Sequence, residues 1–177
     1  MMSYWADGPI SVSVNEICKR AGVSKPGLYR EFGSEDGLKR ATLIAYQAIV
    51  LTQLQEILAR DQPFDETLDD LITFIRQDRV ASGLPNGCLY VEMCENRDHL
   101  GELTTEKIDL LRQQTLDHYA NWIDRAKAKG QFKPDIPTQT AAFYINAQIG
   151  SAMKMQKQGD AINDISNFLK IAFSVFS

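Results

Sequence analysis

Apolar residues recur along this chain at intervals of three and four positions, whereas the strict alternation typical of strands is almost absent. Intervals of three and four place apolar side chains on one face of a helix. Five stretches show the pattern most clearly, and they start at Leu38, Leu68, Ile108, Ala141 and Ile162. The pattern predicts an all-α fold of roughly eight helices, short near the N-terminus and longer after it.

Turn-forming residues divide these stretches. Pro63, residues 83–87 and residues 130–137 carry the glycines and prolines that interrupt helices. Gly130 follows Lys127 and Lys129, a sequence that suits the C-terminal end of a helix. The helices are therefore expected to pack in succession, with short connections between them.

The first part of the chain has the pattern of a helix–turn–helix. Ser13 is suited to cap a helix, and Glu16 three positions later completes a capping box. Gly22 fits a tight turn, in which Val23 is expected to be the buried apolar residue. Ser24 is suited to cap a second helix, placed to enter the major groove of DNA. An ordinary helical hairpin fits the spacing alone equally well.

Composition narrows the function classes. The 177 residues include 19 Lys and Arg against 23 Asp and Glu, a net charge of −4, with 44% hydrophobic residues. These values exclude a disordered chain and a protein that coats nucleic acid through global positive charge. Residues 1–46 carry six cations and five anions, a net charge of +1, which leaves 13 cations and 18 anions, a net charge of −5, for residues 47–177.

Residues 13–32 and the following residues 33–38 closely resemble the DNA-binding segment of TetR/AcrR-family transcriptional regulators. The run Ala-Gly-Val-Ser-Lys at residues 21–25, followed by Leu28, Tyr29 and Phe32, carries the resemblance. It implies a helix–turn–helix DNA-binding domain over residues 1–46 and a helical ligand-binding and dimerisation domain over residues 47–177.

The resemblance also implies which residues meet DNA. Lys25 is the expected base reader, because the N-terminal residues of a recognition helix lie deepest in the groove. Hydroxyl groups and helix N-terminal amides suit phosphate contacts. Ordinary capping or solvation is the alternative for each polar residue. The expected DNA-binding residues are Ser13, Ser24, Lys25, Pro26, Gly27, Tyr29 and Arg30.

Two features depart from the family pattern. Ser34, Glu35 and Asp36 stand where many members carry a phosphate-binding lysine, so two anions are expected near the DNA. Only residues 4–8 resemble the family's first helix, and Tyr4 and Trp5 are expected to be stranded core residues. Either this helix starts upstream, or the DNA-binding domain is truncated and binds DNA weakly or not at all.

For residues 47–177 the resemblance implies a small-molecule sensor that forms a homodimer. Aromatic and apolar side chains are candidates for an effector pocket, although core packing explains each of them as well. The pocket candidates are Phe74, Tyr90, Met93, Tyr119, Trp122 and Phe143. Pairing of the last two helices across a two-fold axis would give a four-helix bundle. Its expected interface residues are Tyr144, Gly150, Ala152, Ile165, Phe168, Leu169 and Phe173.

Cysteine and histidine suggest little further chemistry. On one helix, Cys88 and Cys94 would be separated by about 9 Å of rise, too far for a disulfide, so buried free thiols are expected. A metal ligand pair of Cys94 and His99 is the alternative that their spacing leaves open. No nucleophile–base grouping or phosphate-binding loop is present, which predicts no catalytic site, no metal and no cofactor.

These features together predict a ligand-responsive transcriptional regulator, usually a repressor. It would bind a near-palindromic double-stranded operator as a homodimer and be released by a small-molecule effector. The apolar stretches fall short of the ~20 residues of a membrane span and the N-terminus has no signal-peptide pattern, so a cytoplasmic protein without membrane contact is expected. The alternative is a dimeric ligand-binding or interaction module that has lost DNA binding with its first helix.

Overall fold

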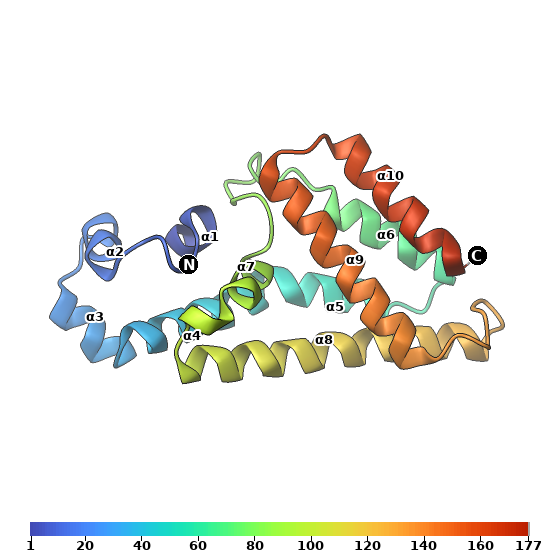
Figure 1. The fold of residues 1–177 in the computed structure, drawn as a ribbon, viewed down its shortest axis with the longest axis horizontal. Helices are drawn as coiled ribbons and strands as arrows, with labels where there is room; N and C mark the ends of the chain where they lie inside the picture. Colours follow the sequence, from blue (N-terminus) through green and yellow to red (C-terminus); the bar gives the residue numbers. More distant parts are fainter. Residues whose placement is uncertain (177) are drawn as a thin grey trace.

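The structure, a computed structural model, describes residues 1–176, which are helical over most of their length (Figure 1). No strand occurs in this range, so the predicted all-α class is confirmed. Ten α-helices are present rather than eight. The extra ones arise because helices of about two turns or less are too short to show an apolar period. In chain order the α-helices are α1 (Met2–Asp7), α2 (Val14–Ala21), α3 (Lys25–Phe32), α4 (Glu35–Tyr46), α5 (Thr52–Ala59), α6 (Phe64–Ile75), α7 (Leu89–Glu95), α8 (Glu102–Ala128), α9 (Thr138–Gln158) and α10 (Ile162–Phe173).

The predicted helix–turn–helix is present in α2 and α3. The Ser13 hydroxyl accepts from the Glu16 amide at 3.2 Å, and the Ser24 hydroxyl accepts from the Gly27 amide at 3.1 Å. Gly22 ends α2 with φ of 67°, a left-handed conformation that glycine adopts without a steric penalty. The prediction for Val23 is wrong. Its side chain is 48% exposed, because the turn lies at the outer end of the molecule, where no other element covers it.

A single helical stretch connects this end to the rest of the protein. α4 continues without a break into a π-helical segment, η1 (Gln47–Leu51), and then into α5. The predicted domain boundary after residue 46 falls where α4 becomes η1. The stretch Glu35–Ala59 has the length and apolar character of a membrane span, but core helices of water-soluble folds share these properties. Here it packs along α8 (Figure 1).

The molecule is elongated, with α2 and α3 at one end and the close of α10 at the other (Figure 1). The long helix α8 runs along one side and packs against α4, α5 and α9, and α10 packs on α9. At the far end Phe64 stacks on Trp122, with ring centroids 4.6 Å apart, and meets the edge of Phe132. Two 3-10 segments, η2 (Arg97–His99) and η3 (Ser174–Phe176), complete the described chain.

Helix α1 is part of the core. Tyr4 and Trp5 are 1% and 0% exposed, and the edge of the Trp5 ring meets Tyr46 of α4 at 4.9 Å between centroids. The expectation that these two side chains are stranded is therefore wrong. They are buried because α1 packs into the angle between α4 and α7, where α7 supplies a contact surface that is distant in sequence.

Asp36 joins the first turn of α4 to the start of α8. Its carboxylate accepts hydrogen bonds from the amides of Leu103 at 2.9 Å and Thr104 at 3.2 Å, and the Thr104 hydroxyl also donates to it. Gly101 permits this approach, because a Cβ at that position would lie 2.3 Å from the Asp36 carboxyl carbon. Asp36 therefore caps α8 from a distant helix, where a negative charge also interacts favourably with the helix dipole.

Lys157 makes a second connection, from the end of α9 to α1. Its ammonium donates to the carbonyl oxygens of Trp5 at 2.9 Å and Ala6 at 3.0 Å. It also pairs with Glu92 of α7 at 2.9 Å. Backbone carbonyls at the end of α1 are thus satisfied by a cation from the C-terminal part of the chain.

We expect Asp36→Ala to lower the free energy of unfolding by about 1–3 kcal/mol, because the α8 amides lose their acceptor. Gly101→Ala should act through the same contact, so the double variant should lose less than the sum of the single losses. Urea unfolding followed by circular dichroism would measure both. Asp98→Ala is the matched control, since Asp98 is exposed in η2. Equal stability of Asp36→Ala and Asp98→Ala would contradict the capping role.

Candidate DNA interface and effector cavity

The helix–turn–helix presents most of its predicted DNA-binding residues on the surface. Ser13, Ser24, Lys25, Pro26 and Arg30 are exposed, while Gly27 and Tyr29 are half-buried. The two serine hydroxyls use oxygen lone pairs to cap α2 and α3, which leaves each O–H free to donate to a phosphate. The Lys25 ammonium lies 5.7 Å from the centroid of the Tyr29 ring, so these two residues share one patch of α3.

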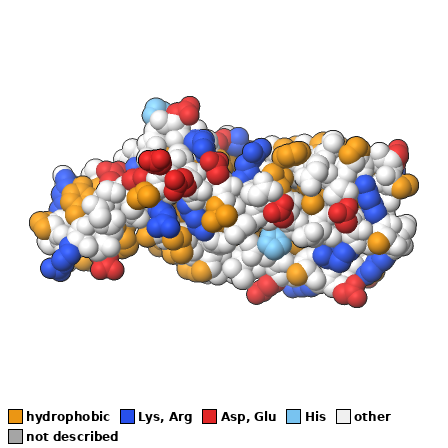
Figure 2. All heavy atoms as spheres, turned by 90° about the horizontal axis from the view of Figure 1, so that it is seen from below, with side chains coloured by type: hydrophobic (Ala, Val, Ile, Leu, Met, Phe, Trp, Pro, Cys, Tyr) orange, Lys and Arg blue, Asp and Glu red, His pale blue; other side chains and the backbone are white. Residues whose placement is uncertain are grey.

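The positive charge at this end is local. Arg20 is paired with both Asp7 and Glu16, and Lys39 with Glu35. Within the described chain, the exposed cations of this end that form no ion pair are Lys19, Lys25, Arg30 and Arg40. Lysine and arginine side chains lie at the outer corners of the end that carries α2 and α3 (Figure 2). The periodicity of the sequence does not single out Arg40, which is exposed on α4 close behind the recognition helix.

The two anions at the start of α4 have structural partners. Glu35 pairs with Lys39 at 2.8 Å, and Asp36 caps α8. The two anions expected near the DNA are therefore both engaged, because Glu35 pairs with an ammonium group and Asp36 accepts from backbone amides. The partners of Asp36 lie 67 and 68 residues away, which explains why local sequence does not reveal them.

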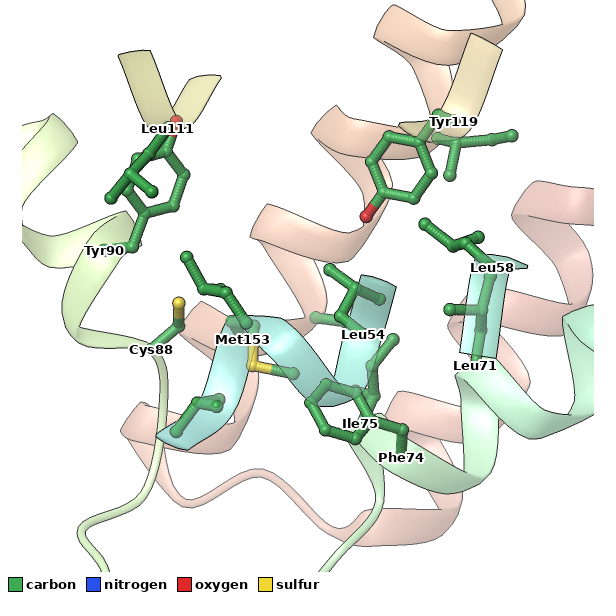
Figure 3. Packing of buried hydrophobic residues seen from close by; sticks show 14 of the residues in the cluster. Leu54, Leu58, Leu71, Phe74, Ile75, Cys88, Tyr90, Leu111, Tyr119 and Met153 are labelled. Atoms are coloured by element: carbon green, nitrogen blue, oxygen red, sulfur yellow. The ribbon is translucent and has the colours of Figure 1, made fainter. Parts of the chain in front are cut away.

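A cavity of about 650 Å³ lies between the α4–α5 stretch and helices α7, α8 and α9. Its size is within the range of small-molecule sites. Figure 3 shows Leu54, Phe74, Tyr90 and Met153 around this space, with the Tyr119 hydroxyl pointing into it. Two ion pairs stand among its exposed lining residues, Arg97 with Asp109 at 2.7 Å and Lys154 with Glu95.

Three of the six pocket candidates line this cavity, namely Phe74, Tyr90 and Tyr119. The other three do not. Met93 is fully buried among the core residues, and Trp122 stacks on Phe64 in the distant aromatic cluster. Phe143 is 48% exposed, with the Arg112 guanidinium over its ring at 5.9 Å. Helical spacing identifies an apolar position but not which space its side chain faces.

Two polar residues that line the cavity could not be identified from the sequence pattern. Tyr46 belongs to an apolar helical stripe, yet its hydroxyl donates to the Cys88 thiol at 3.1 Å. Arg79 belongs to the connection after α6, and its side chain lines the cavity although the residue is only 4% exposed. No motif surrounds Arg79, and only the tertiary fold brings it to this site.

The cysteines are free thiols, as predicted, but their burial differs. Cys18 and Cys88 are buried, whereas Cys94 is only partly buried. Burial raises the pKa of Cys88, and it raises the pKa of Cys94 to about 11. Both groups are therefore protonated at neutral pH, and a protonated thiol is a poor nucleophile. Among residues 1–176 no cluster of three or more His, Cys, Asp and Glu side chains suits a metal ion.

The predicted dimer residues divide by burial. Ala152, Ile165, Leu169 and Phe173 are at most 1% exposed within the single chain, so the expectation that they contact a partner directly is corrected. They instead join α9 and α10 to the core of their own protomer. Tyr144, Gly150 and Phe168 are partly exposed, and Gly150 also lines the cavity. The exposed apolar side chains of these helices are Phe143 on α9, Ile162 and Ile171 on α10 and Val175 in η3.

Comparisons with known proteins support this arrangement. The model of the family described as "Bacterial regulatory proteins, tetR family" matches residues 2–42. The HTH-type transcriptional repressor ComR of Escherichia coli K12 is 20% identical over 169 residues, which cover 93% of this chain and 79% of ComR.

Solved structures show the same fold. A TetR-family transcriptional regulator from Agrobacterium tumefaciens superposes with a TM-score of 0.85 at 14% identity, covering 99% of this chain and 92% of that chain. A cysteine-substituted form of the TetR-family regulator CifR, solved with 26-base-pair operator DNA, has a TM-score of 0.79 at 18% identity with the same coverage. The family match includes α1, the recognition helix and the start of α4, which are the elements that form the proposed DNA interface.

Residues 2–42 therefore match the tetR-family model, and the chain as a whole has the fold of solved TetR-family regulators, which supports a DNA-binding transcriptional regulator.

Proposed function

We propose that this protein is a repressor that binds its operator as a homodimer and leaves it when a small molecule occupies the cavity between α4–α5, α7, α8 and α9. The observation that carries the proposal is the unbroken helical stretch Glu35–Ala59. Its first turn directly follows the recognition helix, and four of its later residues, Tyr46, Val50, Leu51 and Leu54, line the cavity. One stretch of helix thus touches both sites.

The DNA contacts are proposed to centre on α3. Lys25 would read a base edge, Tyr29 and the two serine hydroxyls would bind phosphates, and Pro26 with Gly27 would allow close approach. Lys19, Arg30 and Arg40 would add charge at the backbone of the DNA. The DNA-binding end has only a few unpaired cations, so its affinity for DNA must come from a few contacts with individual phosphates. The affinity that such contacts provide falls as the salt concentration rises.

The release step is proposed to be a shift between two conformations. A ligand that fits the cavity better when α4 is displaced would favour dimers whose recognition helices have the wrong separation for the operator. The π-helical segment η1 itself contains two of the cavity-lining residues, Val50 and Leu51, and directly follows a third, Tyr46. π-helical turns are irregularities that are frequent at functional sites, so η1 is the proposed place where α4 changes direction.

The dimer is proposed to form through the outer surfaces of α9 and α10, with Phe143, Phe168, Ile171 and Val175 as its apolar contacts. These side chains are exposed or partly exposed in the single chain, and Ile171 is 74% exposed. A two-fold axis there would place two recognition helices about one turn of DNA apart, ~34 Å, or a multiple of it, which implies a near-palindromic operator. A cytoplasmic location follows from such a role.

The alternative, a module without DNA binding, has less support. This alternative assumed that the first helix of the DNA-binding domain is truncated. In the structure α1 buries Tyr4 and Trp5, and the family match begins at residue 2.

We expect Lys25→Ala to weaken operator binding about tenfold or more, because a base contact and a positive charge are lost. Tyr29→Phe should weaken it less, since the ring remains and only the phenol is removed. Mobility shift on the DNA that flanks its own gene would measure both. Lys129→Ala is the control, because Lys129 lies at the far end of α8 and pairs with Asp61. Equal affinity of Lys25→Ala and Lys129→Ala would show that α3 is not the recognition helix.

Operator affinity should also fall by at least about tenfold between roughly 50 and 200 mM salt, because phosphate contacts release counterions. Fluorescence anisotropy with a labelled operator duplex would measure the slope. An affinity that does not change over this range would contradict the proposed phosphate contacts.

Ile171→Glu should convert the dimer to monomers, because a carboxylate would lose its hydration in the centre of the proposed interface. Light scattering after size-exclusion chromatography would report the mass. Ile10→Glu is a matched control, since Ile10 is also an exposed isoleucine (51%) but lies outside α9 and α10. An Ile171→Glu protein that remains dimeric would place the interface elsewhere.

A further inference from the structure

Arg79 is a buried cation that lines the cavity. The residue is 4% exposed, and its guanidinium carbon lies 5.0 Å from the centroid of the Phe74 ring. Tyr46 and Cys88 lie close enough for its positive charge to oppose the upward shift of their pKa values that burial causes. The guanidinium therefore stands at the inner wall of the cavity, beside the helical stretch that follows the recognition helix.

This guanidinium lacks the partner that a buried charge requires. Its Nε atom has no hydrogen-bond acceptor, and no carboxylate within residues 1–176 forms an ion pair with it. The neighbouring acid, Asp78, instead accepts from the Ala81 amide at 3.0 Å. The two carboxylates in the cavity lining, Glu95 and Asp109, are paired with Lys154 and Arg97. An unpaired buried charge is costly, so a ligand anion would remove an existing penalty.

The position of Arg79 is held by the fold. Its carbonyl accepts from the amides of Ser82 at 3.0 Å and Leu84 at 2.8 Å, which closes a tight turn around it. The buried Gln156 of α9 then ties both ends of this connection. Its amide group donates to the carbonyl of Ile75 at 3.0 Å, and its oxygen accepts from the Gly87 amide at 3.1 Å. The backbone that carries Arg79 is consequently fixed, which lowers the entropic cost of binding a ligand at this place.

The rest of the cavity has a matching character. Its lining contains four cations, Arg79, Arg97, Arg112 and Lys154, against the two carboxylates, in a protein whose net charge is −4. Most of the other lining side chains are apolar or aromatic, including Leu54, Phe74, Ile108 and Met153. The Tyr119 hydroxyl points into the same space and offers a second donor (Figure 3). A cation at the inner wall of an apolar chamber suits a ligand with one anionic group and an apolar body.

We infer that the effector of this protein is an apolar carboxylate, whose carboxylate group binds the Arg79 guanidinium at the inner wall of the cavity. Arginine suits this role because its planar N–H donors match both oxygens of a carboxylate. The apolar body would fill the space between Leu54, Phe74 and Met153. This inference rests on the proposed function for its regulatory meaning, but ligand binding itself can be measured without DNA.

The test uses three probes of one shape, 2-naphthoate, 2-naphthalenemethanol and 2-naphthalenemethylamine, titrated into the full chain by calorimetry. We expect naphthoate to bind about tenfold or more tightly than the alcohol, and the amine to bind least, because a charge-assisted hydrogen bond distinguishes them. Arg79→Gln should remove the preference for naphthoate while leaving the affinity for the alcohol within twofold. Arg76→Gln, which changes an exposed arginine on the same connection, should behave as the unchanged protein.

A thermal melt of the ligand-free protein gives a second readout. If the Arg79 guanidinium has no anionic partner in the ligand-free protein, Arg79→Met should keep or raise the Tm. The substitution replaces an unpaired buried charge by an apolar side chain that still covers Phe74. A lower Tm for Arg79→Met would assign Arg79 a structural role and overturn the inference. Equal affinities for the three probes, no binding of any of them, or unchanged naphthoate binding by Arg79→Gln would overturn it as well.

Failure of this inference is distinguishable from failure of the proposed function. Operator binding by the ligand-free protein tests the repressor, and it requires no ligand. If the protein binds its operator but shows no charge preference in the calorimetry, the carboxylate is wrong and the repressor stands. If naphthoate binds through Arg79 but the protein does not bind the operator, the ligand class stands and the repressor is wrong.

Discussion

The stretch Glu35–Ala59 is the constraint on which the rest of the structure depends. It is one helical stretch, yet its N-terminal turn holds the recognition helix in place and its later turns form a wall of the cavity. Two contacts hold this helical stretch against the rest of the protein. Asp36 at its start caps α8, and Tyr46 near its middle receives the edge of Trp5 from α1. Under the proposed release step, a displacement of the helix at the cavity would reach the recognition helix through this stretch.

The polar contacts between the two parts of the chain explain how such a displacement would be transmitted. Asp36 binds backbone amides of α8, and Lys157 binds backbone carbonyls of α1. In both places one part of the chain satisfies helix-end groups of the other, so the end of α1 and the start of α8 each depend on a residue distant in sequence. The partner of Lys157, Glu92, lies on α7, the helix that also supplies Tyr90 and Cys94 to the cavity lining.

The charge distribution separates two kinds of recognition in one acidic chain. At the DNA-binding end, exposed lysines and arginines lie on α3 and its neighbours, and four of the five acids are used in ion pairs or a cap. The fifth acid, Glu31 of α3, is exposed and forms no ion pair in the described part of the chain. In the cavity lining, Arg112 is exposed, whereas Arg79 is buried and has no anionic partner in the described part of the chain. Exposed cations suit a polyanion that releases counterions, whereas a single buried cation suits a small monoanion.

Local sequence determined the features that depend on neighbouring residues. Ser13, Gly22 and Ser24 specify the helix–turn–helix, because caps and left-handed turns involve residues only a few positions apart. The periodic apolar stripes likewise specify the all-α class. Only the tertiary structure decided which stripe faces the cavity, the core or solvent, as the different positions of Tyr119, Trp122 and Phe143 show. It also decided the roles of Asp36, Arg79 and Lys157, because the groups that each of them meets, or fails to meet, are brought together by packing between helices far apart in the sequence.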